Sequence, residues 1–167
     1  PYKSPTDMGV NMVGFCISDD EVCCEASKNE IVRRYYAATN KLAMGACNEA
    51  EITKIQMLFN QAKINTDYRK VTVAAKNHKK ETEHTSAAIE LEDGTIICGH
   101  SSELLGCSAA LLLNVMKHLG GIDHELKLIP QSMIKPIQHT KISYLGGHNP
   151  RLHTDEVLVA LSVLSEN

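Results

Sequence analysis

The sequence predicts an α/β fold in which a helical N-terminal subdomain, residues 1–66, is followed by an α/β subdomain, residues 67–167. Three observations support this class. Apolar residues recur near a 3.6-residue period over residues 19–64, an Asp93-Gly94 pair separates two β-prone runs, and residues 109–115 are apolar nearly all round. Together they predict two helices, and then a β-hairpin, a buried helix, a strand and further helices.

The first two helices are predicted over residues 19–45 and 49–64. Gly45 is typical of the end of a helix, and Asn48 is a typical N-cap for the second one. The connection between them is short, so the two are expected to pack as a hairpin. Their lysines and arginines are expected to form a solvated face.

The β-hairpin is the next expected element. The helical pattern breaks near residues 65–68, and a polar helical segment continues to about residue 83. Residues 86–92 and 95–98 are then β-prone, and Asp-Gly between such runs is a strong signal for a tight hairpin turn.

The remaining elements follow from apolar runs and their breakers. A buried helix is predicted over about residues 106–119, ended by Gly120-Gly121, and residues 126–130 predict one strand closed by Pro130. Residues 131–145 predict a helix that Pro136 kinks or starts anew. The last helix is expected to begin near Thr154.

Composition and charge limit the classes of function. Apolar residues make up 43% and charged residues 22% of the 167 residues, with a formal net charge of −3. This balance predicts neither a nucleic-acid partner nor, without a long apolar run, a membrane partner. The six cysteines are interpreted as free thiols rather than a disulfide framework, which predicts a cytoplasmic location. The chain begins with Pro1 and is expected to be part of a longer protein.

The segment GHNPRLHTDE, residues 147–156, is the strongest candidate site. His153, Arg151 and His148 are predicted as catalytic groups and Asn149 as a substrate ligand, because histidine transfers protons and arginine binds carboxylate or phosphate. In the plainer interpretation Asn149-Pro150 forms a turn and Thr154 caps the helix. Asp155 and Glu156 are assigned mainly to supporting the positive end of that helix.

A second segment, GHSSELLG at residues 99–106, precedes the buried helix. Free N–H groups at a helix start attract anions, so Ser101, Ser102 and His100 are predicted to bind an anion together with Arg151. An ordinary strand-to-helix cap is the alternative. No Walker motif is present, because the required spacing and lysine are missing.

A third segment, SPTDMGVNM at residues 4–12, supports two interpretations equally. It is either a capped amphipathic helix or a site loop. In a site loop, Asp7 and Asn11 would bind substrate, through hydrogen bonds to a sugar, or would coordinate Mg²⁺. The other histidines show no ligand spacing and are assigned to surface or satisfied positions; they are His78, His84, His118, His124 and His139.

The segments SPTDMGVNM, DGTIICGHSSELLGCSAALLLN and GHNPRLHTDE, in this order, resemble the C-terminal part of a bacterial family described as domain of unknown function 1846. The resemblance covers essentially the whole chain. It implies an N-terminal domain, missing here, as a partner within the same protein, and it implies no particular reaction.

A weaker resemblance is to zinc-dependent nucleoside deaminases, in which a hairpin leads into a buried helix carrying metal ligands. It implies a cytidine deaminase-like topology, with Cys107 near the ligand position. The H-x-E and P-C-x-x-C motifs of those enzymes are absent, so no zinc site at Cys98 or Cys107 and no other metal or cofactor is predicted.

Two hypotheses of function follow. The first is part of a cytoplasmic enzyme that binds a small anionic metabolite, phosphorylated or nucleotide-like. The alternative is a non-catalytic scaffold or oligomerisation module, and a homo-oligomer is expected in either case.

Overall fold

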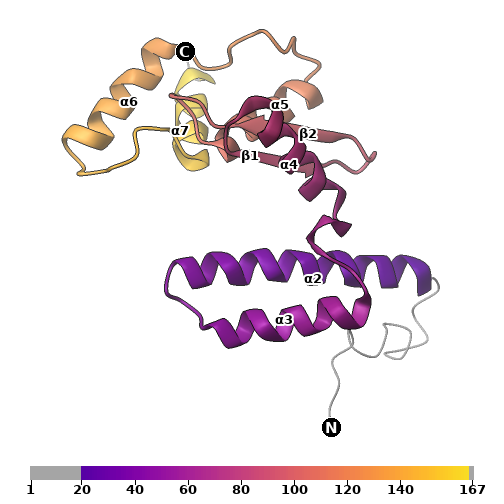
Figure 1. Ribbon diagram of the computed structural model, residues 1–167. Helices are drawn as coiled ribbons and strands as arrows, with labels where there is room; N and C mark the ends of the chain where they lie inside the picture. The colour runs from indigo at the N-terminus through magenta and orange to yellow at the C-terminus, as the bar shows by residue number, and fades with distance from the viewer. Residues whose placement is uncertain (1–19, 166–167) are drawn as a thin grey trace. The chain divides into compact units, whose positions relative to one another are not determined.

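The chain divides into two compact units, Pro1–Lys70 and Val71–Asn167, and a computed structural model describes residues 20–165 (Figure 1). The described residues combine helices with one two-stranded antiparallel sheet, so the predicted α/β class is confirmed. Asp7 and Asn11, both predicted to bind substrate, lie outside the described residues.

The first unit contains a helical hairpin formed by α2, Asp20–Ala43, and α3, Glu49–Ala62, followed by a short 3-10 helix, Thr66–Tyr68. The connection bends where it was expected to, with Gly45 at a φ of +71°. Asn48 is the N-cap of α3, and its side-chain oxygen accepts a hydrogen bond from the Glu51 N–H at 3.3 Å. Ile31, Ala38 and Ile55 are buried between the helices, which confirms the predicted packing.

The second unit starts with α4, Lys70–Thr82, and the β-hairpin of β1, Ser86–Glu90, and β2, Ile96–His100. The strands are antiparallel, with Ala88 opposite Cys98. Asp93 accepts a hydrogen bond from the Thr95 N–H at 2.9 Å, and Gly94 has a φ of +83° that few other residues tolerate. The predicted hairpin and its turn are therefore confirmed.

Helix α5, Cys107–Leu119, packs closely against the hairpin. A Cβ atom on Gly99 of β2 would lie only 2.4 Å from the Leu111 backbone nitrogen. Only Ala109 and Leu113 of α5 are buried, while Leu119 is 70% exposed. The prediction that this helix is buried nearly all round is wrong, because a sheet of two strands covers only part of its circumference.

The core of the second unit is completed by α6, Gln131–Ser143, and α7, Thr154–Ser165. Seven buried residues form it: Ala109, Leu113, Ile129, Ile134, Leu152, Val157 and Ala160. Pro136 lies inside α6, which does not start anew there.

The strand predicted over residues 126–130 is not formed, because this run lies in a loop that pairs with neither strand of the hairpin. It contributes the buried Ile129 to the core, and Pro130 is the N-cap residue of α6. The apolar run was thus a sign of burial and was mistaken for a sign of pairing.

Candidate functional site

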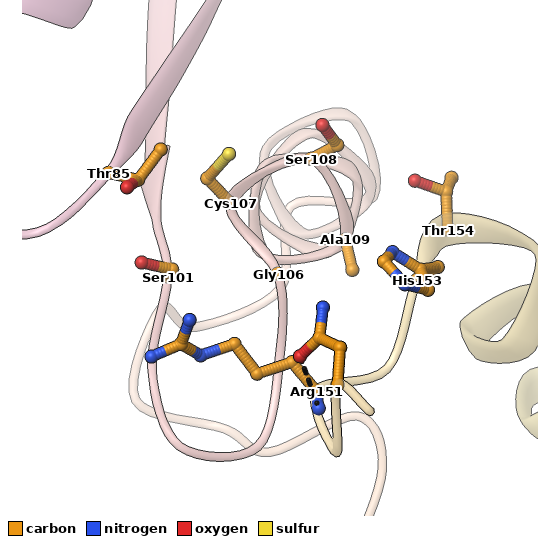
Figure 2. A pocket seen from close by; sticks show the side chains of 10 residues that line it. Thr85, Ser101, Gly106, Cys107, Ser108, Ala109, Arg151, His153 and Thr154 are labelled. Atoms are coloured by element: carbon orange, nitrogen blue, oxygen red, sulfur yellow. Dashed lines mark hydrogen bonds between the residues drawn. The ribbon is translucent and has the colours of Figure 1, made fainter. Parts of the chain in front are cut away.

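A pocket of about 290 Å³ lies in the second unit, where the first residues of α5 and α7 face the same space (Figure 2). Most of its lining residues have polar side chains, including an arginine and a histidine, and none is an aspartate or a glutamate. The lining residues are Thr85, Ser101, Gly106, Cys107, Ser108, Ala109, Asn149, Arg151, His153 and Thr154.

The two helix starts meet because the loops before them pair with each other. Leu105 and Leu152 form a parallel β-bridge. The Leu152 N–H donates to the Leu104 carbonyl at 2.9 Å, and the Gly106 N–H donates to the Leu152 carbonyl at 3.0 Å. Leu152 itself is fully buried in the core, so hydrophobic burial fixes this pairing. Two of the three predicted segments, residues 99–106 and 147–156, therefore converge.

The start of α5 presents free hydrogen-bond donors to this space. Gly106 is its N-cap and offers no side-chain cap, while its carbonyl accepts from the Ala110 N–H. Within residues 20–165, the N–H groups of Cys107, Ser108 and Ala109 have no hydrogen-bond partner. Such groups, together with the helix dipole, favour an anion at the start of a helix.

Arg151 is held in place by its backbone and by one side-chain nitrogen. Its N–H donates to the Asn149 Oδ1 at 3.1 Å, and its Nε donates to the Ser102 carbonyl at 2.7 Å. In the described part of the chain, the two Nη groups have no partner, which leaves both of them able to bind a ligand. Because Asn149 uses its oxygen, its amide NH₂ also remains as a donor.

Ser101 is a buried residue that contributes its hydroxyl to the pocket. Its N–H donates to the Thr85 carbonyl at 2.8 Å, which ties the end of β2 to the residue before β1. The residue is only 7% exposed, yet no partner for its hydroxyl exists among residues 20–165. The oxygen itself is not enclosed, because no fully buried side-chain oxygen or nitrogen lacks a partner in the described residues, so a ligand in the pocket can bond to it.

Glu156 supports the start of α7 without lining the pocket. Its Oε2 accepts from the His153 N–H at 2.7 Å and from Lys141 Nζ at 2.8 Å. Burial would raise the pKa of Glu156, but the hydrogen bonds from Lys141 and His153 outweigh it and lower the pKa. His153 is the N-cap of α7, since its carbonyl accepts from the Val157 N–H; Thr154, which was predicted as the cap, is the first helical residue.

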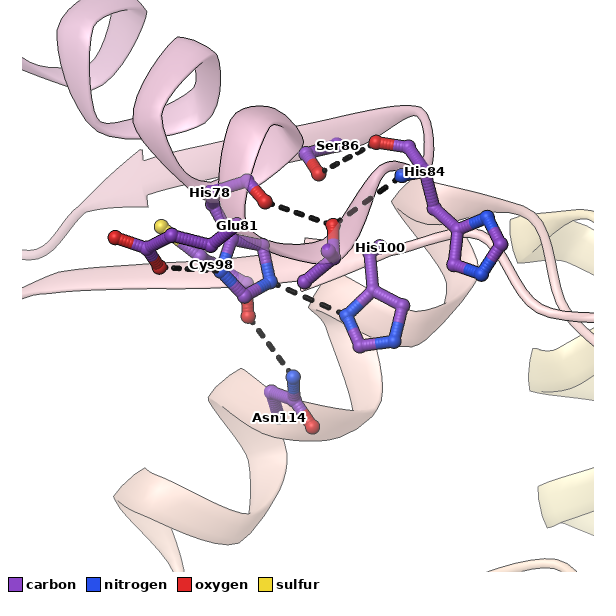
Figure 3. Close-up of polar contacts among 8 residues, drawn as sticks. His78, Glu81, His84, Ser86, Cys98, His100 and Asn114 are labelled. Atoms are coloured by element: carbon purple, nitrogen blue, oxygen red, sulfur yellow. Dashed lines mark hydrogen bonds and ion pairs between the residues drawn. The ribbon is translucent and has the colours of Figure 1, made fainter.

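His100 faces a different part of the second unit from the pocket (Figure 3). Its Nδ1 lies 3.2 Å from Nε2 of His78 on α4, and its ring stacks on that of His84 with the centroids 5.9 Å apart. Burial lowers the pKa of His100, as do His78 and His84. In the described ranges, no group of three or more histidine, cysteine, aspartate or glutamate residues is arranged to hold a metal ion.

The structure thus brings together four of the predicted site residues: Ser101, Asn149, Arg151 and His153. His148 and Ser102 are exposed and do not line the pocket, although the Ser102 carbonyl fixes Arg151. Sequence reasoning missed Thr85 and Ser108, and it considered Cys107 only as a zinc ligand. The position of Cys107 directly after a glycine at a helix start was the available signal.

Comparison with known proteins gives a consistent family relationship. Two family models match, namely Domain of unknown function DUF1846, N-terminal, over residues 1–63 and Domain of unknown function DUF1846, C-terminal, over residues 67–167. A UPF0371 protein of Corynebacterium aurimucosum is 53% identical over 163 residues, covering 98% of this chain and 33% of the relative. The UPF0371 protein str1377 of Streptococcus thermophilus is 48% identical over 167 residues, covering 100% of this chain and 34% of the relative.

The chain therefore spans about a third of the length of these curated relatives. Neither family description and neither of these two relatives' names mentions a deaminase, so the deaminase-like resemblance is not shown. Among residues 20–165, no helix combines the length and apolar character needed to cross a membrane.

Proposed function

Because this chain belongs to the family described as domain of unknown function DUF1846, whose description assigns no activity, we propose a function from the pocket itself. The pocket binds the anionic group of a small phosphorylated metabolite. One observation carries this proposal: the starts of α5 and α7 and the Arg151 side chain line the same space, and no acidic side chain lines it.

The pocket places a cation near the positive ends of helices. A helix carries roughly half a positive charge at its N-terminus, so a guanidinium that lines the same pocket as such an end is unfavourable by about 0.3–1 kcal/mol. A bound phosphate would reverse this cost, since it would accept hydrogen bonds from the free N–H groups of α5 and from the Nη groups of Arg151. The Ser101 hydroxyl and the Asn149 amide would provide further donors.

The shape of the pocket favours a small ligand over a nucleotide-like one. Its volume of about 290 Å³ lies at the lower limit of small-molecule sites, which run from roughly 300 to 1,000 Å³. No phenylalanine or tyrosine lines it, so a nucleobase would find no such ring to stack on. We propose further that the pocket forms part of an enzyme site, in which His153 is the proton-transferring group.

Titration calorimetry with inorganic phosphate at constant ionic strength tests the proposal. Arg151→Ala should weaken phosphate binding by about tenfold or more, since a charged hydrogen-bonded contact contributes about 1.5–3 kcal/mol. It should lower the free energy of unfolding by about 1 kcal/mol or less, because only the exposed bond to Ser102 is lost.

Lys135→Ala is the matched control, because Lys135 is an exposed cation on α6 outside the pocket and its loss changes the net charge equally. Equal phosphate affinity in the two variants, or no binding by the unaltered chain, would contradict the proposal.

The alternative function, a scaffold or oligomerisation module, is favoured by a different observation. Helix α7 leaves Leu158 49% and Val159 63% exposed, which is an apolar surface on a structural helix. Self-association measured by sedimentation velocity, lost in Val159→Asp and accompanied by no phosphate binding, would favour this alternative.

A further inference from the structure

We propose that Cys107 is the reactive group of the pocket, a thiol that small anionic electrophiles modify in preference to neutral ones. This inference rests on the proposed function, because the same donors that bind phosphate would bring a negatively charged reagent to the sulfur atom. It adds a site of covalent chemistry to a site of binding.

The position of Cys107 supports the proposal. It is the first residue of α5, it is half-buried, and it lines the pocket together with Arg151 and His153 (Figure 2). Reactive cysteines occur in electropositive, partly exposed surroundings at helix starts, whereas structural ones are enclosed by apolar groups. The lining of this pocket is of the first kind.

An independent observation points to a ligand in the same space. Ser101 enters the pocket from the end of β2, not from α5, and it is 7% exposed with a hydroxyl that lacks a partner within residues 20–165. The little surface that this residue exposes includes the hydroxyl oxygen, because no fully enclosed side-chain oxygen lacks a partner in the described residues. A molecule bound beside Cys107 would supply the missing hydrogen bond.

Three of the other four described cysteines provide a contrast. Burial raises the pKa of the Cys98 thiol, with a further contribution from Glu81. Burial and then Glu51 raise the pKa of the Cys47 thiol, which also donates to the Ala38 carbonyl at 3.3 Å. Both are therefore held in the unreactive thiol form. Cys24 on α2 is exposed and serves as the reference for a thiol outside the pocket.

The test compares iodoacetate, which is anionic, with iodoacetamide, which is neutral and similar in size. In both reactions a bond forms between the cysteine sulfur and the methylene carbon, the carbon–iodine bond breaks, iodide leaves with the bonding electrons, and the thiol proton passes to solvent. Rate constants at Cys107 and Cys24 in the full chain are measured by mass spectrometry of peptides.

The ratio of the iodoacetate to the iodoacetamide rate constant should be about fivefold higher at Cys107 than at Cys24. Inorganic phosphate at constant ionic strength should slow iodoacetate at Cys107 and leave Cys24 unaffected. Arg151→Ala should lower the ratio at Cys107 toward that at Cys24, and Lys135→Ala should not change it. Phosphate protection provides a second measurement if Arg151→Ala fails to fold.

Equal ratios at the two cysteines would overturn the inference. If calorimetry still detects phosphate binding that depends on Arg151, the proposed function survives and only the role of Cys107 fails. If calorimetry detects no phosphate binding either, both fail. A high ratio that neither phosphate nor Arg151→Ala lowers would also reject the inference, because the preference would then not arise from the anion site.

Discussion

Glu156 connects the start of α7 to α6 through a single carboxylate oxygen. That oxygen accepts from the His153 N–H and from Lys141 Nζ, and Lys141 also donates to the Arg151 carbonyl at 2.9 Å. The ion pair between Glu156 and Lys141 thus links α6 to the backbone of both His153 and Arg151. Glu156 therefore has a structural role that fixes where Arg151 and His153 lie.

The lowered pKa of Glu156 makes this role testable by pH. Because the folded-state pKa lies below the ordinary value of 4.5, the carboxylate stabilises the folded chain fully above about pH 4.5, and this contribution is lost as the pH falls through the folded-state pKa. Glu156→Gln keeps an acceptor for the His153 N–H and removes the charge. It should lower the free energy of unfolding by about 1 kcal/mol at neutral pH, measured by urea denaturation, with the difference shrinking below about pH 4.

Glu125→Gln is the control for this change, because Glu125 is exposed in the loop between α5 and α6. It should leave stability unchanged at either pH. Equal stability of the two variants at neutral pH would mean that the ion pair with Lys141 contributes nothing measurable.

Single residues also show what the sequence could and could not predict about the site. Arg151 and His153 were predicted as site residues because the cap of the last helix was assigned to Thr154, and an arginine at the positive end of a helix requires a reason. His153 is nevertheless the N-cap residue in the structure. Ser101 could be suspected but not placed, since the burial of the residue depends on the folded chain, in which its N–H donates to the Thr85 carbonyl. The position of His100 outside the pocket could not be predicted either, because only the folded chain brings His78 of α4 beside it.

Helix α5 approaches strand β2 so closely at Gly99 that a side chain at this position has no room. Gly99→Ala would bring a Cβ atom within 2.4 Å of the Leu111 nitrogen and 2.6 Å of its Cα, and backbone atoms cannot rotate away. We expect this variant to lose about 1–3 kcal/mol or more of unfolding free energy, measured by thermal or urea denaturation, because the helix must move off the hairpin.

The matched comparison is Gly106→Ala. At this position the added Cβ atom would meet only the Leu152 carbonyl at 3.5 Å, an ordinary contact. Its cost should stay below about 1 kcal/mol, the difference between glycine and alanine at an N-cap. The close approach of α5 to β2 would be refuted if Gly99→Ala were as stable as Gly106→Ala.

Elements with a local signal were predicted well, and those that depend on distant partners were not. The turn at Asp93-Gly94 and the cap at Asn48 are both formed by residues within three positions of each other, so the sequence contains the whole interaction. A strand at residues 126–130 needed a neighbouring strand, and no local pattern can show that none is close enough to pair. The convergence of the two loops depends on the Leu105–Leu152 bridge between residues far apart in the chain.

The described residues, 20–165, contain two hydrophobic clusters that share no residue. One cluster, with Ile31, Ala38 and Ile55, is built from the first unit, and the other, with Ile129, Ile134 and Val157 among its members, is built from the second. The sequence predicts a division after residue 66, close to the limit between the two units at Lys70–Val71. We therefore expect the two units to unfold as separate cooperative transitions.

Two isoleucine substitutions test this expectation, because the side chains match in size and both are buried, with Ile55 8% and Ile134 3% exposed. Each change to alanine should cost about 2–5 kcal/mol, but only in its own unit. In hydrogen exchange followed by mass spectrometry, Ile55→Ala should speed exchange in peptides of α2 and α3 and leave those of α5 protected, whereas Ile134→Ala should do the reverse. If either substitution speeds exchange equally in α3 and α5, the chain unfolds as one unit, and a phosphate-binding pocket in the second unit would then depend on the stability of the first.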